Sequence, residues 1–326
     1  MKKPVITGIG AYVPKGLLTN KDLEKIVETS DEWITSRTGI QERRIASQKE
    51  VTTDLALEAA KIALKRAGVK ARNLDYIIFA TATPDMLFPS AGCVLQHKLG
   101  AKHAACFDVA AGCSGFIYAL SIAEKFILSG EAEHILVVGA EILSRIVDWS
   151  DRNTCVLFGD GAGVAVVSAM EGDRGIISTI IKSDGSYGDL LKLPGGGSLH
   201  PASLESVENK LHYVKMVGNE VFKKAVKSME DISVEILEKN GFEGKDVDLL
   251  VPHQANLRII SAVQKRTGIP ENRTYINIHK YGNTSAASIP IALFEACERG
   301  FLRERDLVLC VAFGAGFTWG AGLIRW

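Results

Sequence analysis

The chain is best interpreted outward from FDVAAGCSGFIYALSIAEKFILSG, residues 107–130. This stretch predicts a short apolar strand, a turn of small residues and a helix with Cys113 in its first turn. Apolar side chains cover nearly every face of the helix, which is typical of a buried helix. Its first turn offers unpaired backbone N–H groups and the positive end of the helix dipole, which both favour a thiolate. Cys113 is therefore a candidate nucleophile.

A free cysteine is more often a small core residue, since free thiols are among the most buried side chains. The neighbours of Cys113 favour the functional interpretation. Gly112, Ser114 and Gly115 are small, so they let a substrate approach the sulfur and let the backbone turn sharply from strand to helix.

Composition narrows the class of protein. The 326 residues are 47% hydrophobic, and 38 basic residues balance 38 acidic ones. Because a nucleic-acid-binding protein normally has a basic excess, we expect no nucleic-acid partner. The amino terminus MKKPVITGIG lacks the apolar run of a signal peptide, and no stretch reaches the roughly 20 apolar residues of a membrane span. We therefore expect a soluble, cytoplasmic protein with no membrane partner.

The cysteines predict neither a disulfide framework nor a metal site. They stand at positions 93, 106, 113, 155, 297 and 310, without a CxxC pair and mostly within apolar runs. Scattered cysteines of this kind fit reduced thiols in the cytoplasm better than a zinc site. We expect no bound metal.

Strands and helices alternate along the chain. VITGIGAYVP (5–14) predicts a first strand, DLALEAAKIALKRAG (54–68) an amphipathic helix and LDYIIFATAT (74–83) a continuous apolar strand of the kind found in sheets covered on both faces. This alternation predicts an α/β fold with a largely parallel sheet.

The second part of the chain repeats the first. ALKRAGVKARNLDYI, from residue 63, aligns without a gap with ILEKNGFEGKDVDLL, from residue 236, and HILVVG aligns with DLVLCV at nearly the same offset. A spacing maintained across two elements indicates an internal duplication. We expect two similar halves, residues 1–172 and 173–326, with Cys113 and Asn283 near equivalent strand-to-helix turns.

Residues 183–215, between the repeated elements, are rich in glycine and polar residues. The PGGGS sequence lacks the GxxxxGK[ST] spacing of a phosphate loop. We expect this segment to form a surface loop over the site rather than a domain.

Two further polar residues follow the pattern of Cys113. His253 directly follows the apolar strand in LLVPHQAN, and Asn283 lies in the turn YGNTSAASIP. Ligands of open α/β sheets bind at the carboxyl ends of strands, so a pseudo-twofold would bring Cys113, His253 and Asn283 together. The glycine-rich turn of AFGAGFTWG (312–320) has free N–H groups that suit an oxyanion hole.

Taken together, these motifs closely resemble those of a known family. AAGCSGF, VPHQAN and YGNTSAASIP, with DEWITSRTGI near the start and AFGAGFTWG near the end, resemble β-ketoacyl-acyl carrier protein synthase III of the thiolase superfamily. The resemblance spans residues 1–326. It implies a five-layered αβαβα fold of two duplicated halves, a homodimer, and the first condensation of bacterial type II fatty-acid synthesis. It implies no cofactor, since the coenzyme A thioester, most simply acetyl-CoA, is a substrate.

The resemblance also assigns the catalytic roles. Cys113 becomes the acylated nucleophile, and His253 and Asn283 bind the malonyl thioester carbonyl and assist decarboxylation. The backbone N–H groups of Cys113 and Ala315 form the oxyanion hole, and Phe313 lies against the malonyl carboxylate. Decarboxylation builds negative charge on the carbonyl oxygen, so two neutral donors in a dry pocket suit it.

Further residues gain substrate-binding roles only through the family. Trp33 and Arg152 would sandwich the adenine of coenzyme A, with Arg37 near its phosphates and Asn256 on the pantetheine arm. Phe88 would cross the dimer interface into the acyl pocket of the other subunit. Without the family these are an exposed tryptophan, surface arginines and a core phenylalanine.

The family implies a docking surface for the acidic acyl carrier protein as well. Basic residues on two helices would form its rim, although charged residues on helices are usually just a solvated face. The expected surface comprises Gln254, Ala255, Asn256, Leu257, Arg258, Lys223, Lys265 and Arg266.

Several alternatives differ from this family in chemistry. A thiolase needs a second cysteine in the carboxyl-terminal glycine turn, which GAGFTWG lacks, and the elongating synthases have a second histidine where this chain has Asn283. Plant-type polyketide synthases and other relatives that share the cysteine, histidine and asparagine remain alternatives. A cysteine hydrolase and a non-catalytic acyl-binding protein are different classes, which acyl transfer without hydrolysis, followed by carbon–carbon bond formation, would distinguish. Primer length depends on pocket depth around Phe88, Leu143 and Phe158.

Overall fold

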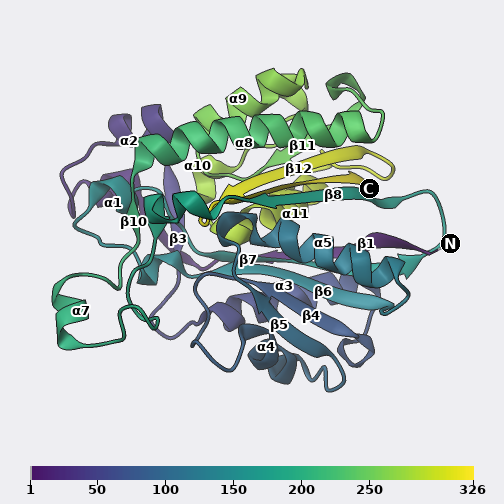
Figure 1. Ribbon diagram of the computed structural model, residues 1–326, viewed down its shortest axis with the longest axis horizontal. Coiled ribbons are helices and arrows are strands. Elements are labelled where there is room, and N and C mark those ends of the chain that lie inside the picture. Colours follow the sequence, from purple (N-terminus) through teal and green to yellow (C-terminus); the bar gives the residue numbers. More distant parts are fainter. Residues whose placement is uncertain (1) are drawn as a thin grey trace.

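Two mixed β-sheets alternate with three layers of helices in the computed structural model, which describes residues 2–326 (Figure 1). The first sheet has the order β1-β7-β6-β4-β5 and the second the order β11-β12-β13-β8. The first is built from β1 (Lys3–Tyr12), β7 (Gly161–Met170), β6 (His134–Glu141), β4 (Tyr76–Ala80) and β5 (Ala105–Val109). The second is built from β11 (Leu249–Pro252), β12 (Leu307–Gly314), β13 (Thr318–Arg325) and β8 (Gly175–Ser183).

Helices cover both faces of each sheet. The outer pairs are α3 (Thr52–Ala67) with α4 (Ala91–Leu99) on the first sheet, and α8 (Gly218–Lys239) with α9 (Leu257–Thr267) on the second. The central pair, α5 (Gly115–Leu128) and α11 (Ser288–Glu298), lies between the sheets. The layers follow the order αβαβα, as expected (Figure 1).

Shorter elements complete the chain. The remaining helices are α1 (Asn20–Leu23), α2 (Asp31–Thr38), α6 (Arg152–Cys155), α7 (Leu204–Glu208) and α10 (Ile278–Tyr281). The remaining strands are β2 (Gly16–Thr19), β3 (Glu42–Ile45), β9 (Leu191–Lys192) and β10 (Lys215–Met216). The short 3₁₀ helices are η1 (Ala71–Asn73), η2 (Gly112–Ser114), η3 (Leu143–Arg145), η4 (Gly185–Leu190), η5 (Gly244–Asp246), η6 (Glu271–Arg273) and η7 (Ser285–Ala287). None of the helices within residues 2–326 is long and apolar enough to cross a membrane.

The prediction of a largely parallel sheet was wrong. In the first sheet β4 pairs in parallel with β5 and β6, whereas β7 pairs antiparallel with β6 and β1. In the second sheet β12 and β13 form an antiparallel hairpin. Two neighbouring strands that are joined without a crossover helix run antiparallel. The apolar sequence of a strand does not reveal its direction.

The predicted duplication is confirmed in the order of elements. β4, β6, η2 and α5 begin 173 residues before β11, β12, η7 and α11, respectively. Each sheet has the same sequence of pairings, because β8, β13, β12 and β11 take the places of β1, β7, β6 and β4. In this register Cys113 matches Ala286, and Asn283 lies three residues earlier, at the entrance to the same turn.

The central helix α5 is buried between the sheets, as its sequence predicts. Phe116, Ile117, Leu120 and Ala123 are at most 1% exposed. Burying a large apolar side chain stabilises a fold by roughly 1.5–3 kcal/mol, so this helix contributes strongly to joining the halves. Its amino terminus is fixed in position as a result.

Candidate active site

Cys113 lies where two cavities meet. It occupies the turn η2, immediately before α5. Both cavities include Cys113, Phe158 and Leu191 in their walls. The first, the apolar cavity, is lined by Ala82, Gly112, Cys113, Leu143, Ile146, Val147, Phe158, Leu191, Lys192, Leu193, Val214, Ser285 and Ala315. The second, the donor cavity, contains Cys113, His253, Asn283, Phe313, Asn256 and apolar residues of α8 and α9. The structure thus brings the three predicted polar residues together.

Burial of the Cys113 thiol works against the predicted thiolate. Loss of solvation raises its pKa to about 12, and the charge of Glu141 adds to this. The hydroxyl of Ser285 and the backbone N–H of Cys113 act in the opposite direction but do not prevail. The helix terminus alone would favour the thiolate, whereas the cost of burying a charged sulfur is larger here. This environment therefore favours the thiol over the thiolate in the resting enzyme.

His253 is a buried, neutral imidazole. Its backbone N–H donates to the carbonyl of Val311, 2.8 Å away, which holds it at the end of β11. Nδ1 lies 2.6 Å from the Ser288 hydroxyl, so Nε2 is the nitrogen left for a ligand in the donor cavity. Burial lowers the pKa of His253 to about 3. The ring therefore stays uncharged at neutral pH.

Asn283 is held through its backbone and its side-chain oxygen. Its N–H donates to the carbonyl of Leu157 (2.8 Å), and its own carbonyl accepts from Gly159 (3.0 Å). Oδ1 accepts from the backbone N–H of Ser285 at 2.8 Å. Because the oxygen is occupied, the NH₂ group is the part of the amide that can donate to a ligand.

Two glycines bring the expected oxyanion-hole amides together. A Cβ atom at Gly314 would lie 2.5 Å from the backbone nitrogen of Cys113, and one at Gly112 would lie 2.8 Å from that of Ala315. Only residues without a Cβ allow the two chain segments to approach this closely. The two backbone N–H groups of the expected oxyanion hole therefore lie on closely packed segments.

Phe313 and Asn256 line the donor cavity with Cys113. The Phe313 ring packs on Phe317, with centroids 4.8 Å apart. Asn256 is the N-cap of α9: its Oδ1 accepts from the Arg258 N–H at 2.9 Å, while its Nδ2 donates to a backbone carbonyl of α2. Asn256 therefore has a structural function in addition to its place in the cavity.

The expected adenine-binding residues lie together, and their side chains stack on one another with no space for a base between them. The guanidinium groups of Arg37 and Arg152 are 4.8 and 5.1 Å from the centroid of the Trp33 ring. Arg152 also donates to the carbonyl of Glu28 at 3.1 Å. The resemblance implies that Trp33 and Arg152 sandwich the adenine, which stays a prediction; in this structure the Arg152 guanidinium lies over the Trp33 ring itself.

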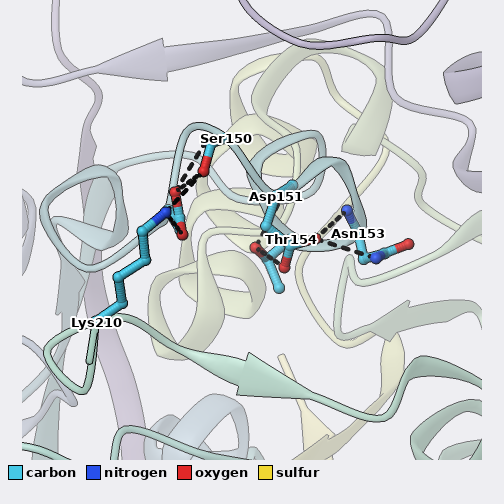
Figure 2. A network of polar contacts seen from close by, with 6 residues as sticks. Ser150, Asp151, Asn153, Thr154 and Lys210 are labelled. Atoms are coloured by element: carbon cyan, nitrogen blue, oxygen red, sulfur yellow. Dashed lines mark hydrogen bonds and ion pairs between the residues drawn. The ribbon is translucent and has the colours of Figure 1, made fainter. Parts of the chain in front are cut away.

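A polar network holds the segment that carries Arg152. Figure 2 shows Lys210 directed at Ser150, and Asp151 bonded to its neighbours Asn153 and Thr154. Lys210 Nζ lies 2.9 Å from a carboxylate oxygen of Asp148 and 3.0 Å from Ser150 Oγ. Since residues 183–215 also form part of the apolar cavity wall, this network joins that loop to the segment before α6. The loop thus covers the site, as expected.

Phe88 lies outside both cavities of its own chain. It is 84% exposed, next to Leu87 at 77% and Met86 at 50%. The core phenylalanine that the sequence suggests without the family does not fit this exposure. The expected role across a dimer interface stays a prediction.

The expected carrier-protein surface needs one correction. Gln254 is 1% exposed; its Nε2 donates to the carbonyls of Pro252 and Tyr275, and its Oε1 accepts from the N–H groups of Asn277 and Ile278. These bonds use the whole amide within the protein, so it is unsuited to a docking contact.

The other expected docking residues lie on the outermost layer, formed by α8 and α9 (Figure 1). Leu257 and Arg258 are exposed in the first turn of α9, and Ala255 is half-buried before it. Lys223 is exposed on α8 and pairs with Glu220 at 2.8 Å. Exposed Lys265 and Arg266 lie in the last turn of α9. At 1.5 Å per residue, they are about 10 Å along the helix from Arg258.

Sequence reasoning missed three polar residues behind the site, Ser285, Ser288 and Glu141. The first two lie within YGNTSAASIP, where only Asn283 received a role. Glu141 ends a run of apolar residues, and a carboxylate directly after a buried strand is the signal that could have found it.

The fold and site define a thiolase-like enzyme, and comparisons with known proteins identify its family. The family model for 3-oxoacyl-[acyl-carrier-protein] synthase III matches residues 107–185, and the model for its carboxyl-terminal part matches residues 237–326. A β-ketoacyl-[acyl-carrier-protein] synthase III of Caldanaerobacter subterraneus is 55% identical over 98% of this chain and 97% of that protein.

Solved structures of the same family support this assignment. The crystal structure of 3-oxoacyl-[acyl-carrier-protein] synthase III from Aquifex aeolicus covers 100% of both chains, with 51% identity and a TM-score of 0.91. The corresponding Thermus thermophilus structure is 44% identical, with a TM-score of 0.92 over 99% of both chains. This chain belongs to the β-ketoacyl-[acyl-carrier-protein] synthase III family and is an acyltransferase of fatty-acid biosynthesis.

Proposed function

We propose that the enzyme condenses an acyl-CoA primer, acetyl-CoA in the simplest case, with malonyl-acyl carrier protein. The products are 3-oxoacyl-acyl carrier protein, coenzyme A and CO₂, and the reaction initiates type II fatty-acid synthesis. It proceeds by a ping-pong mechanism through an acyl group on Cys113. We place the enzyme in the cytoplasm because its proposed substrates occur there, and the reaction needs no cofactor.

The observation that supports this proposal most strongly is the position of Cys113 between two cavities. The apolar cavity suits the chain of an acyl group attached to the sulfur. The donor cavity, with His253 and Asn283, suits a carbonyl oxygen that gains negative charge. One nucleophile can therefore hold the primer on one side and meet the second substrate on the other.

In the first half-reaction the Cys113 sulfur attacks the acyl-CoA carbonyl. The N–H groups of Cys113 and Ala315 stabilise the tetrahedral oxyanion, and their proximity in the fold supports this role. One thioester replaces another, so the step costs little free energy, and coenzyme A leaves before the second substrate binds.

In the second half-reaction malonyl-acyl carrier protein loses CO₂, and the resulting carbanion attacks the acyl group on Cys113. Nε2 of His253 and the NH₂ group of Asn283 donate to the malonyl thioester carbonyl as its negative charge develops. Each such donor contributes about 3 kcal/mol to a transition state of this kind. Phe313 lies against the departing carboxylate, where an apolar ring favours the loss of charge as CO₂ forms.

Coenzyme A binds through Trp33, Arg152, Arg37 and Asn256. For the adenine to stack on Trp33, the Arg152 guanidinium must leave the ring and close over the base from the other side. An arginine exposed on a four-residue helix can make this movement. Arg37 then lies near the phosphates, and Asn256 near the pantetheine arm.

The carrier protein docks on the outer surface of α8 and α9. Lys223 and Arg258 are adjacent in sequence to Phe222 and Ile259, which line the donor cavity, and the exposed Leu257 offers the partner an apolar contact. Lys265 and Arg266 extend the positive charge along α9. We leave Gln254 out of this surface, while Ala255 and Asn256 form the rim of the cavity beneath it.

The enzyme acts as a homodimer, with Phe88 completing the acyl pocket of the other subunit. The exposed run of Met86, Leu87 and Phe88 supports this arrangement, since contiguous exposed apolar side chains mark interaction surfaces.

One experiment tests the reaction. The enzyme is incubated with acyl-CoA thioesters of increasing length and branching, the intact mass is recorded, and malonyl-acyl carrier protein is then added. We expect a stable mass increase for the preferred primer, followed by its loss and the appearance of 3-oxoacyl-acyl carrier protein. Release of free acid instead would indicate a hydrolase, and an acyl group that is never transferred would indicate a binding protein.

A further inference from the structure

Glu141 is a buried carboxylate beside the site with no role in the steps above. It ends β6, is 0% exposed, and accepts hydrogen bonds from the backbone N–H of Ala82 (3.1 Å) and the hydroxyls of Thr81 (3.2 Å) and Thr83 (2.5 Å). Within residues 2–326 no lysine, arginine or histidine forms an ion pair with it. A buried carboxylate without a cation is costly, which makes its retention in a site informative.

Ser285 connects Glu141 with the catalytic centre. Its hydroxyl donates to Glu141 Oε1 at 3.0 Å, while its backbone N–H holds the side-chain oxygen of Asn283. Ser285 lines the apolar cavity with Cys113, and its hydroxyl acts to lower the pKa of that thiol. Its φ of +50° is uncommon for a non-glycine residue, which indicates that the surrounding structure imposes this position. The order across the site is Cys113, Ser285, Glu141.

Acylation requires an acceptor for the Cys113 proton. Since burial raises the pKa of the thiol to about 12, very little of it is ionised at pH 7. His253 is a poor acceptor because burial lowers its pKa to about 3. Burial raises the pKa of Glu141 to about 7, although its hydrogen bonds oppose the shift. An acceptor that titrates near the working pH is the efficient choice for proton transfer.

We propose that Ser285 and Glu141 form a proton relay that takes the proton of Cys113 during acylation and returns it when condensation releases the sulfur. The proposal rests on the proposed function of Cys113. Ser285 shares the wall of the apolar cavity with the reacting thiol, and Glu141 acts through Ser285.

The bonds and protons of the relay balance over the catalytic cycle. As Cys113 attacks, its S–H bond breaks, the proton passes to Ser285 Oγ, and the Ser285 proton passes to the Glu141 carboxylate. The S–C bond to the acyl group forms, the bond to the donor sulfur breaks, and the departing thiolate takes a proton from water. In the second half-reaction the carbanion left by CO₂ loss displaces Cys113 as a thiolate. The proton stored on Glu141 returns through Ser285 and restores the thiol.

Few other ionisable groups face Glu141. Cys113, on the turn before α5, is the one whose charge would couple to it directly. Arg145, on the turn after β6, donates to the carbonyls of Ser47 and Glu50, and Asp85, after β4, accepts from Thr53. The pH dependence of the acylation rate should therefore follow the titration of the Glu141 carboxyl group.

The test compares Glu141→Gln, Glu141→Asp and Ser285→Ala by rapid-quench acylation from acyl-CoA between pH 5.5 and 9, values chosen to span about one and a half to two units on either side of a pKa near 7. In wild type we expect the rate to fall about tenfold per pH unit as Glu141 becomes protonated on the acid side. Glu141→Gln and Ser285→Ala should acylate about 10²–10⁴ times more slowly, the usual contribution of a proton acceptor. Glu141→Asp should recover part of the rate with its pH dependence.

Two controls distinguish a relay from a purely electrostatic or packing role of Glu141. Once acylated, Glu141→Gln should still form product from malonyl-acyl carrier protein in a single turnover, because the carbanion displaces Cys113 as a thiolate before the stored proton returns, so its loss in condensation should be much smaller than its loss in acylation. Iodoacetamide labelling of Cys113, mapped by peptide mass, needs no acyl donor: a relay predicts slower labelling in Glu141→Gln, whereas a purely electrostatic Glu141 predicts faster labelling. Wild-type or faster acylation and labelling in Glu141→Gln would overturn the relay. A wild-type protein that labels with iodoacetamide but accepts no acyl group would contradict the proposed function instead. Because Ser285→Ala keeps the backbone bond to Asn283, it tests the relay even where Glu141→Gln fails to fold.

Discussion

The Nδ1 atom of His253 lies 2.6 Å from the hydroxyl of Ser288, and the backbone N–H of Gln254 points at the same oxygen from 3.4 Å. Because Ser288 accepts from Gln254, its own proton is free to go to Nδ1. This arrangement favours the neutral tautomer whose hydrogen is on Nε2, the nitrogen left for the donor cavity. In the proposed mechanism, Ser288 thus sets His253 as a hydrogen-bond donor to the substrate carbonyl.

Ser288→Ala should reduce condensation about tenfold, as expected for loss of a hydrogen bond to a buried group, and leave acylation within twofold. Single-turnover rates of the two half-reactions measure this. Nitrogen-15 NMR of the ring should show a shift toward the other tautomer, and Ser288→Thr, which keeps the hydroxyl, is the control. An unchanged tautomer with equal losses in both half-reactions would assign Ser288 a packing role only.

His253→Ala and Asn283→Ala should separate the half-reactions. Acylation should stay within about tenfold of wild type, because neither residue takes the thiol proton in the proposed relay. Condensation should fall about 10²–10³, the scale for one missing donor to a developing oxyanion. Mass spectrometry should show that both variants accumulate acyl-enzyme. A His253→Ala enzyme that fails to acylate, beside an Asn283→Ala enzyme that acylates, would instead make His253 the base for Cys113.

Gly314→Ala should impair both half-reactions. The added methyl group would lie 2.5 Å from the Cys113 nitrogen and 2.9 Å from that of Ser114, so the two chain segments must separate. Removing one oxyanion-hole donor costs about 10²–10³ in rate. The matched control is Gly185→Ala, where an added methyl group meets nothing within 4 Å. Wild-type acylation in Gly314→Ala would mean that this pair of amides does not bind the oxyanion.

Arg258→Glu should affect only the step that uses the carrier protein. A negative charge on this surface repels an acidic partner, so condensation should weaken and depend less on salt, while acylation from acyl-CoA is unchanged. The control is Lys239→Glu, an equal charge reversal at the opposite end of α8. At 1.5 Å per residue it lies about 24 Å along that helix from Lys223. Equal losses in both half-reactions would indicate that Arg258, which also donates to the carbonyl of Ser36, stabilises the fold.

Patterns that depend on local sequence predicted the fold well. The buried helix after Cys113, the two halves and the place of His253 at a strand end follow from apolar periodicity and repeated spacing. Strand direction depends on long-range pairing, so the antiparallel position of β7 could not be read from its apolar sequence. Likewise, the pKa of Cys113 depends on the layers that enclose it, and these form only in the complete fold.

The site was predicted where a residue carries its own signal and missed where its role comes from neighbours. Gln254 is polar and adjacent to His253, which suggested a surface contact, yet backbone groups from α10 and the preceding segment surround it. Ser285 and Glu141 are separated by 144 residues, so no spacing in the sequence pairs them.

The central claim is that Cys113 carries the acyl group that condensation consumes. Peptide mapping by mass spectrometry, after incubation with isotopically labelled acyl-CoA and before and after addition of malonyl-acyl carrier protein, tests it most directly. We predict a label on the Cys113 peptide alone, absent in Cys113→Ala, and its quantitative transfer into 3-oxoacyl-acyl carrier protein. A stable label on Cys155 or Cys310, or product formation by Cys113→Ala, would contradict this claim.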